Sequence, residues 1–156
     1  MFCNWNWYSI AVNDSRAASM YQRHYSSSKN KKDIRKWLRY GIAAPGEKIV
    51  LCTSDSRALF VWLKQKYVSN NQKGVNCAVF RNESDHLSSE LILEAEEIAL
   101  NKWPGSRLYT YVDPDSVLSK NPGYCFKIAG WQLVRDKAGK PVRTQKGLII
   151  LEKLYT

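Results

Sequence analysis

The stretch from Val75 to Asn101 constrains the fold more than any other part of the chain. Val75 to Phe80 is a short apolar run rich in β-forming residues, which predicts a buried strand. A polar turn from Arg81 to Leu87 follows, and apolar residues then recur at helical spacing. We expect a long helix that begins at Ser88 or Ser89, with Ser88 as its N-cap. Its solvent face is expected to carry Glu94, Glu96 and Glu97.

A strand that leads directly into a helix N-terminus can bind an anion. The free N–H groups of the first helical turn and the helix dipole point at one place, and phosphate is the usual ligand there. An ordinary strand–helix unit without any ligand has the same pattern. The pattern alone leaves both interpretations open.

Length and composition limit the other possibilities. The 156 residues suit one domain, 1–156, and the net charge of +10 predicts an anionic partner: a nucleic acid, a phosphorylated cofactor or both. We see no apolar run long enough to span a membrane and no signal-peptide pattern. The four cysteines are scattered without a C-x-x-C pair, which favours reduced thiols and a cytoplasmic protein without a metal site.

The positive charge is concentrated between Lys29 and Gly41, where Asp33 is the only acid. Ile34, Trp37 and Leu38 form a short apolar stripe, so we expect a basic amphipathic segment whose charged side contacts phosphates. Trp37 would either stack on a base or, as we expect, anchor the segment to the core. The nucleic-acid-binding candidates are Lys29, Lys31, Lys32, Arg35, Lys36 and Arg39.

The remaining patterns predict an α+β domain with a mixed sheet and helices on its faces. The other predicted strands are 5–12, 48–53, 58–66, 108–112, 131–135 and 148–154, and the other helices are 15–25 and 124–129. Strands 58–66 and 75–80 should be antiparallel. If strands 75–80 and 108–112 run parallel and splay apart, a slot opens between them for an extended ligand.

His24 and Cys125 could be reactive, but the sequence favours structural roles for both. His24, near the end of helix 15–25, is expected to be a surface group compatible with the helix dipole rather than a catalyst. Cys125 is expected to be a core residue, because no base is assigned to it.

The order of elements resembles the GNAT N-acetyltransferase fold. The segments FRNESDHLSSELI, RLYTYVDP and NPGYCFKIAGW resemble small GNAT-like proteins of bacteriophages and their hosts, most strongly from Leu59 to Trp131. The resemblance covers most of the chain. It implies a GNAT-like mixed, mostly antiparallel sheet with helices on both faces, acetyl-CoA or another acyl-CoA in the slot, and acyl-CoA-dependent N-acyltransfer.

The resemblance also implies cofactor contacts. In the family an asparagine and an aromatic residue border the pantetheine arm, and these correspond to Asn121 and Phe126. The phosphate loop of the family is rich in glycine, whereas Arg81 is followed here by serines and by Asp85. Phe126 also replaces the tyrosine that often protonates the departing thiolate. The implied cofactor-binding residues are Phe80, Arg81, Asn82, Ser84, His86, Leu87, Ser88, Ser89, Asn121 and Phe126.

Acyl transfer to an amine needs a base and an acid. Glu83 is the candidate base, although a solvated or Arg81-paired loop residue fits the pattern equally. Asp113 is the next candidate, and its structural alternative is to start a turn. Tyr124 is the candidate acid.

The acceptor is open between several classes. The run Arg23-His24-Tyr25-Ser26 ahead of the basic segment is distantly similar to the Mom-type DNA-modifying proteins of phages, which resemble this fold. Three hypotheses follow: a transferase acting on a small amine or protein, a transferase acting on DNA or tRNA, and a non-catalytic protein that binds nucleic acid or a host factor. A phage-encoded chain would act in the host cytoplasm, as a monomer or homodimer.

Overall fold

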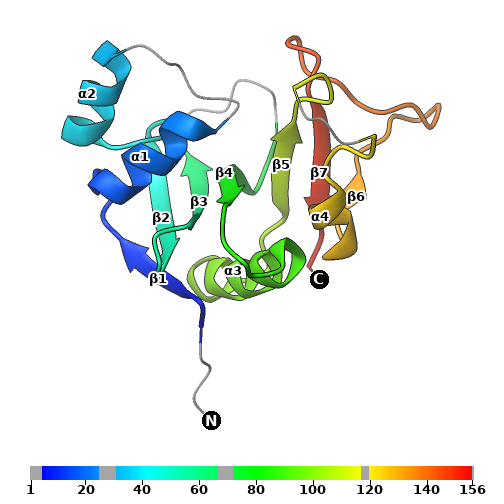
Figure 1. Ribbon diagram of the computed structural model, residues 1–156. Coiled ribbons are helices and arrows are strands. Elements are labelled where there is room, and N and C mark those ends of the chain that lie inside the picture. Colours follow the sequence, from blue (N-terminus) through cyan, green and yellow to red (C-terminus); the bar gives the residue numbers. More distant parts are fainter. Residues whose placement is uncertain (1–4, 25–30, 67–71, 117–119, 156) are drawn as a thin grey trace.

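The computed structural model of this protein describes residues 5–24, 31–66, 72–116 and 120–155 (Figure 1). Within these ranges the chain forms seven strands and four helices. The helices are α1 (Ser15–Arg23), α2 (Lys31–Tyr40), α3 (Ser88–Lys102) and α4 (Tyr124–Ile128). No helix in the described part of the chain has the length and apolar character needed to cross a membrane.

The strands form one sheet in the order β1-β2-β3-β4-β5-β7-β6. Their bounds are β1 (Trp7–Ile10), β2 (Gly46–Thr53), β3 (Ala58–Gln65), β4 (Val75–Asn82), β5 (Leu108–Val112), β6 (Gln132–Leu133) and β7 (Ile149–Lys153). Every neighbouring pair is antiparallel except β4 and β5, which are parallel. The predicted α+β class with a mixed, mostly antiparallel sheet is confirmed.

Helices cover both faces of the sheet (Figure 1). One core joins the sheet to α3 and α4, and its largest members include Phe60, Trp62 and Trp131. A second, smaller core joins the sheet to α1, where Met20 packs with Val50 and other strand residues. The strands alternate between the two cores because successive side chains of a strand point to opposite faces.

A β-bulge in β4 interrupts this alternation. Val61 of β3 pairs with Val79 and the next residue of β3, Trp62, pairs with Cys77, so Ala78 is the extra residue. Cys77 belongs to the α3/α4 core, whereas both Ala78 and Val79 lie on the α1 side. If the alternation continued unbroken from Cys77, Phe80 would point to the α1 side. With the bulge, Phe80 points to the α3/α4 side and packs against that core.

The first two helices have clear local causes. Asp14 caps α1 by accepting a hydrogen bond from the backbone N–H of Arg16 at 2.9 Å. Gly41 ends α2 with a φ of +94°, a left-handed conformation, and a Cβ there would meet Val12 at 2.6 Å. Helix α1 is shorter than predicted, and Tyr25 lies outside the described residues.

Helix α3 differs from the prediction at two positions. Leu87, not Ser88, stands at the N-cap, because the Ser88 hydroxyl accepts a hydrogen bond from the Asn82 side chain instead. Glu96 is buried rather than on the solvent face, with 3% of its surface exposed. Its carboxylate accepts hydrogen bonds from the Trp131 indole, the Lys153 ammonium (2.9 Å) and the Tyr155 hydroxyl (2.7 Å).

The C-terminal strands are shorter than predicted. The expected strand 131–135 is reduced to Gln132 and Leu133, and Arg135 forms only an isolated bridge with Pro141. The long hairpin between β6 and β7 pairs mainly with itself, through backbone hydrogen bonds such as Val142 to Val134 at 3.0 Å. This leaves little of the hairpin to extend the sheet.

Candidate functional site

The parallel strands β4 and β5 separate after three residue pairs. Their register runs from Val75–Leu108 to Cys77–Thr110 and stops there. The Thr110 hydroxyl donates a 2.9 Å hydrogen bond to the Cys77 carbonyl and so fixes the last pair. Beyond this fork the bulge at Ala78 turns β4 out of register, while β5 stays paired with β7 as far as Val112. The predicted slot requires this parallel, splayed arrangement.

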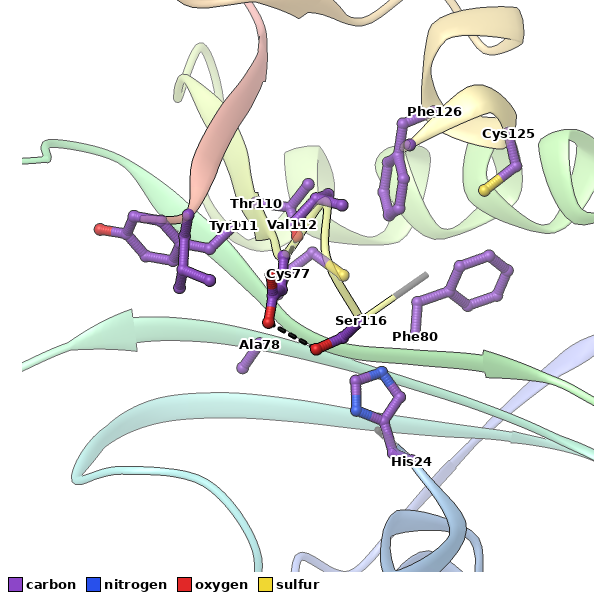
Figure 2. A pocket seen from close by; sticks show the side chains of 13 residues that line it. His24, Cys77, Ala78, Phe80, Thr110, Tyr111, Val112, Ser116, Cys125 and Phe126 are labelled. Carbon is purple, nitrogen blue, oxygen red and sulfur yellow. Dashed lines mark hydrogen bonds between the residues drawn. The ribbon is translucent and has the colours of Figure 1, made fainter. Parts of the chain in front are cut away.

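A cavity of about 420 Å³ lies at the fork (Figure 2). This volume is in the lower part of the range for small-molecule sites, roughly 300–1,000 Å³. Phe80, Val112 and Phe126 line the cavity and pack in the α3/α4 core, whereas Ala78 packs in the α1 core. His24 enters opposite Phe126 (Figure 2). The cavity is therefore lined from both faces of the sheet, and we call it the slot.

The two thiols that line the slot are not activated. Burial raises the pKa of the Cys77 thiol and also that of the Cys125 thiol. The Cys77 sulfur also contacts the Val79 carbonyl oxygen at 3.6 Å, inside the bulge. Both groups stay protonated near neutral pH, so neither is a ready nucleophile. Cys52, Cys77 and Cys125 are free thiols; Cys3 lies outside the described residues.

His24 is buried in the slot wall, which corrects the expectation of a surface group. Only 7% of its surface is exposed. As the C-cap of α1, it donates its backbone N–H to the Tyr21 carbonyl at 2.9 Å, and its ring stacks on Tyr21 with centroids 6.3 Å apart. These contacts hold the imidazole where the slot meets the end of α1. The sequence located this histidine at the helix end but gave no sign of its burial.

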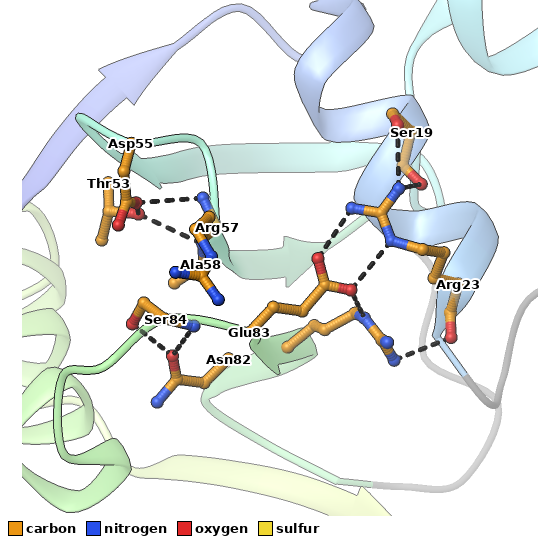
Figure 3. Close-up of polar contacts among 10 residues, drawn as sticks. Ser19, Arg23, Thr53, Asp55, Arg57, Ala58, Asn82, Glu83 and Ser84 are labelled. Carbon is orange, nitrogen blue, oxygen red and sulfur yellow. Dashed lines mark hydrogen bonds and ion pairs between the residues drawn. The ribbon is translucent and has the colours of Figure 1, made fainter.

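Glu83 joins the end of β4 to α1 (Figure 3). Its carboxylate receives two 2.8 Å hydrogen bonds from the Arg23 guanidinium and one of 2.6 Å from Arg81. Arg81 also donates to the Arg23 carbonyl at 2.7 Å. We call these three residues the Arg–Glu clamp. Arg23 first, and then Arg81, hold the pKa of Glu83 at about 2, and a carboxylate so stabilised is a weak base at neutral pH.

The clamp also holds the backbone just before His24. Arg23 is the last residue of α1 and His24 follows it directly. Since Arg81 binds the Arg23 carbonyl, it fixes the peptide that leads into His24. Glu83 is thus paired with Arg81, as the structural alternative to the base predicted.

The loop before α3 is closed by the Asn82 side chain. Its amide donates to the His86 carbonyl at 2.8 Å and to the Ser88 hydroxyl at 2.9 Å. Its oxygen accepts from the N–H and the hydroxyl of Ser84 (Figure 3). The Ser84 hydroxyl accepts in turn from the His86 N–H. The side chains of Ser84 and Ser88 and the backbone of His86 are therefore linked to one another through Asn82.

The other predicted cofactor residues have separate positions. Leu87 is 61% exposed and Ser89 is buried. An α-helix leaves its first N–H groups without partners inside the helix, so those of Ser88 and Ser89 point out of α3. Asn121 accepts a 2.6 Å hydrogen bond from the Lys127 ammonium across α4.

The remaining catalytic candidates lie at the edge of the slot or outside it. Asp113 lines the slot but accepts hydrogen bonds from the Ser116 hydroxyl and the Asp115 N–H, which lower its pKa. Asp113 therefore starts a turn, which is its structural alternative, and its carboxylate is engaged in hydrogen bonds within that turn. Tyr124 is 56% exposed and is not part of the slot wall. No cluster of three or more potential metal ligands occurs among the described residues.

Comparison with known proteins gives no relative. No family model, no curated protein and no solved structure matches the chain.

Proposed function

We propose that this protein is an acyl-CoA-dependent N-acyltransferase of the GNAT type, similar to the small phage proteins. The slot at the fork of β4 and β5 carries the proposal. It is the right size for an acyl group and the thiol end of a carrier, and it is lined from both faces of the sheet. A donor and an acceptor can therefore meet in it from opposite sides.

The slot suits an extended chain that contains amides. Beyond Cys77 and Thr110 the facing edges of β4 and β5 are not paired with each other. Unpaired strand edges bind an extended ligand through main-chain hydrogen bonds, as in strand addition. The pantetheine arm of CoA is such a chain, and the apolar side chains of Phe80, Val112 and Phe126 would enclose its thioester and acyl group.

The diphosphate of the carrier would lie at the start of α3. The first-turn N–H groups of Ser88 and Ser89 would donate to it, helped by the helix dipole. Asn82 and Ser84 would shape this loop from within, since their side chains already bond one another. Side-chain closure by Asn82 would replace the glycines that the family uses in this position.

The slot chemistry favours direct transfer. The amine nitrogen attacks the thioester carbonyl carbon, the C–N bond forms and the C–S bond breaks. The amine loses one proton in total and the departing sulfur gains one, which gives an amide and a free thiol. His24 is the imidazole in the slot wall and would accept the proton of the amine. The protonated thiols of Cys77 and Cys125 do not favour a covalent acyl-enzyme.

A non-catalytic role is the second candidate: a GNAT-like protein that binds nucleic acid or a host protein. It is favoured by the state of the three predicted catalytic residues. Glu83 is ion-paired, Asp113 is occupied by its turn, and Tyr124 lies outside the slot wall.

Calorimetric titration with acetyl-CoA tests the proposal. We expect micromolar binding by the wild-type protein, and a loss of at least about tenfold in affinity for Ala78→Phe, which fills the slot. Ala138→Phe is the matched control, because Ala138 is exposed in the distant β6–β7 hairpin. Leu148→Trp is a second slot variant, for use if Ala78→Phe does not fold.

Two results would overturn the acyltransferase. One is the absence of acetyl-CoA binding to folded wild-type protein at high micromolar ligand. The other is equal affinity of the wild type and both slot variants, which would place the ligand elsewhere. Binding without turnover on any amine would leave the non-catalytic candidate.

A further inference from the structure

We propose that the outer face of α2 is a docking surface for the phosphate backbone of a nucleic acid. This inference goes beyond the proposed function, since it needs neither acyl-CoA nor the slot. The contact residues are Lys32, Arg35, Lys36 and Arg39, which we call the α2 basic face.

Helical spacing puts these four cations on one side of α2. They stand at positions i, i+3, i+4 and i+7, which share one face of an α-helix. At about 1.5 Å per residue the face is roughly 10 Å long. All four residues are exposed. Lys29 lies outside the described residues, and the side chain of Lys31 is not described, so neither enters the argument.

The opposite side of α2 is partly covered by α1. Trp37 is partly buried and packs edge-on against Tyr21 of α1, with ring centroids 4.8 Å apart. The expectation that Trp37 anchors the segment is therefore confirmed. A helix that inserts into a membrane surface needs its apolar side free, and here Tyr21 of α1 covers Trp37, although Leu38 is 46% exposed. This contact favours a soluble polyanion over a lipid bilayer.

Three of the four cations of the α2 basic face have no ion pair within the described part of the chain. Arg35, Lys36 and Arg39 form no ion pair with any acid in the described part of the chain. Asp33 is the single acid of α2. By contrast, the arginines of α1, Arg16 and Arg23, are each bound to a carboxylate. Three cations without an ion pair among the described residues therefore lie on one side of α2.

An exposed aromatic ring accompanies the α2 basic face. Tyr40 is 66% exposed, and the Arg39 guanidinium lies 5.3 Å from its ring centroid. Exposed aromatic rings beside cations bind nucleic acids by stacking on bases while the cations hold phosphates. This pairing favours nucleic acid over an acidic protein surface, which offers no bases.

The α2 basic face lies on one particular face of the sheet. Helices α1 and α2 lie on one face of the sheet, and α3 lies on the other (Figure 1). Helix α3 carries exposed Glu90 and Glu97, which would repel phosphate. A nucleic acid on α2 would therefore lie on the face from which His24 lines the slot.

Fluorescence anisotropy with a labelled 20-bp duplex DNA, and with an RNA of the same sequence, tests the surface. The test variant replaces Lys32, Arg35, Lys36 and Arg39 by glutamine, a good helix former. The control variant replaces Lys73, Lys137, Lys140 and Lys146, all exposed and all outside α2, by glutamine. Both variants lose four charges, so a difference between them reports location rather than net charge.

We expect the α2 variant to lose affinity by about 10³-fold near 0.1 M salt and the control by less than tenfold. Four lost phosphate contacts should reduce the slope of log K against log salt by about 3 to 4. Circular dichroism and acetyl-CoA titration of the same variant check that the fold and the slot are intact. Tighter binding to DNA than to RNA, or the reverse, identifies the natural polymer.

Three outcomes would overturn the inference. Equal losses in the two variants would mean diffuse attraction without an α2 surface. No binding of wild-type protein to either polymer at 50 mM salt would exclude a nucleic acid. Binding to phosphatidylserine vesicles, with none to DNA or RNA, would identify a membrane as the partner. None of these outcomes alters acetyl-CoA binding, so this inference and the proposed function fail separately.

Discussion

The Arg–Glu clamp predicts that Glu83 stabilises the fold, and a substitution of Glu83 can distinguish this role from that of a catalytic base. In Glu83→Gln the side chain keeps its size but loses the charge that holds Arg23 and Arg81. We expect the variant to be less stable than wild type at neutral pH and nearly equal to it in acid. A base would behave differently, because its loss would stop turnover without affecting stability.

The magnitude follows from the depressed pKa of Glu83. The fall from 4.5 to about 2 corresponds to at most about 3 kcal/mol of stability, at roughly 1.4 kcal/mol per unit. The side chains of Arg23 and Arg81 are 45% and 31% exposed, so solvent screens part of this. We expect about 1–2 kcal/mol, or a melting temperature lower by about 3–6 °C.

The pH dependence has a definite sign. A carboxyl whose pKa is depressed in the folded state contributes its full stability above its unfolded pKa, near 4.5, and loses it as the pH falls toward 2. Glutamine does not titrate. The stability difference between wild type and variant should therefore be complete at pH 7 and clearly smaller at pH 3.

Urea unfolding followed by tryptophan fluorescence at both pH values measures this difference, since the chain has six tryptophans. Other carboxyls titrate in both proteins and cancel. Glu97→Gln, at an exposed position of α3, controls for the simple loss of a negative charge. A difference that is the same at pH 7 and pH 3, or no larger than that of the control, would refute the clamp.

Two further stability predictions follow from buried geometry. Glu96→Ala should cost about 3 kcal/mol, because it removes the ion-pair partner of Lys153 and the acceptor of two other donors, while Lys153 keeps another acceptor, the Ala129 carbonyl. A loss below about 1 kcal/mol in urea unfolding would contradict this. Gly123→Ala should cost about 1–3 kcal/mol more than Gly105→Ala. Both glycines have φ above +70°, but a Cβ at Gly123 would lie 2.3 Å from Leu151, whereas the one at Gly105 meets nothing within 4 Å. Equal melting temperatures for these two variants would show that Leu151 moves aside freely.

Local patterns were enough to predict the centre of the fold. The apolar run at Val75, the polar turn and the helical spacing after Ser88 are local signals, and β4 and α3 follow them closely. Strand β5 has the predicted bounds, Leu108–Val112. Each of these elements has its own periodicity and its own turn residues, so no distant contact was needed to recognise it.

Distant contacts decided what the sequence did not predict. Glu96 has three helical neighbours with similar charge, and its burial depends on Lys153 and Tyr155, more than 50 residues away. Similarly, His24 is buried, and the residue before it, Arg23, is bound by Arg81 from the end of β4. The Ser88 hydroxyl accepts a hydrogen bond from Asn82, which lies in the preceding strand, and it does not cap α3. Helical or strand periodicity contains no information on such pairs.

The fork of β4 and β5 is the point at which the two faces of the sheet are connected, and it therefore relates the slot to the α2 basic face. A sheet normally separates the two faces of a domain, and only a gap between strands connects them. Here the Thr110–Cys77 hydrogen bond closes the pairing at one end, and the bulge at Ala78 keeps it open at the other. A carrier from the α3 side and a polyanion on the α2 side would then occupy different surfaces of the domain. The clamp would matter to both partners, because it holds the end of α1 from which His24 enters the slot.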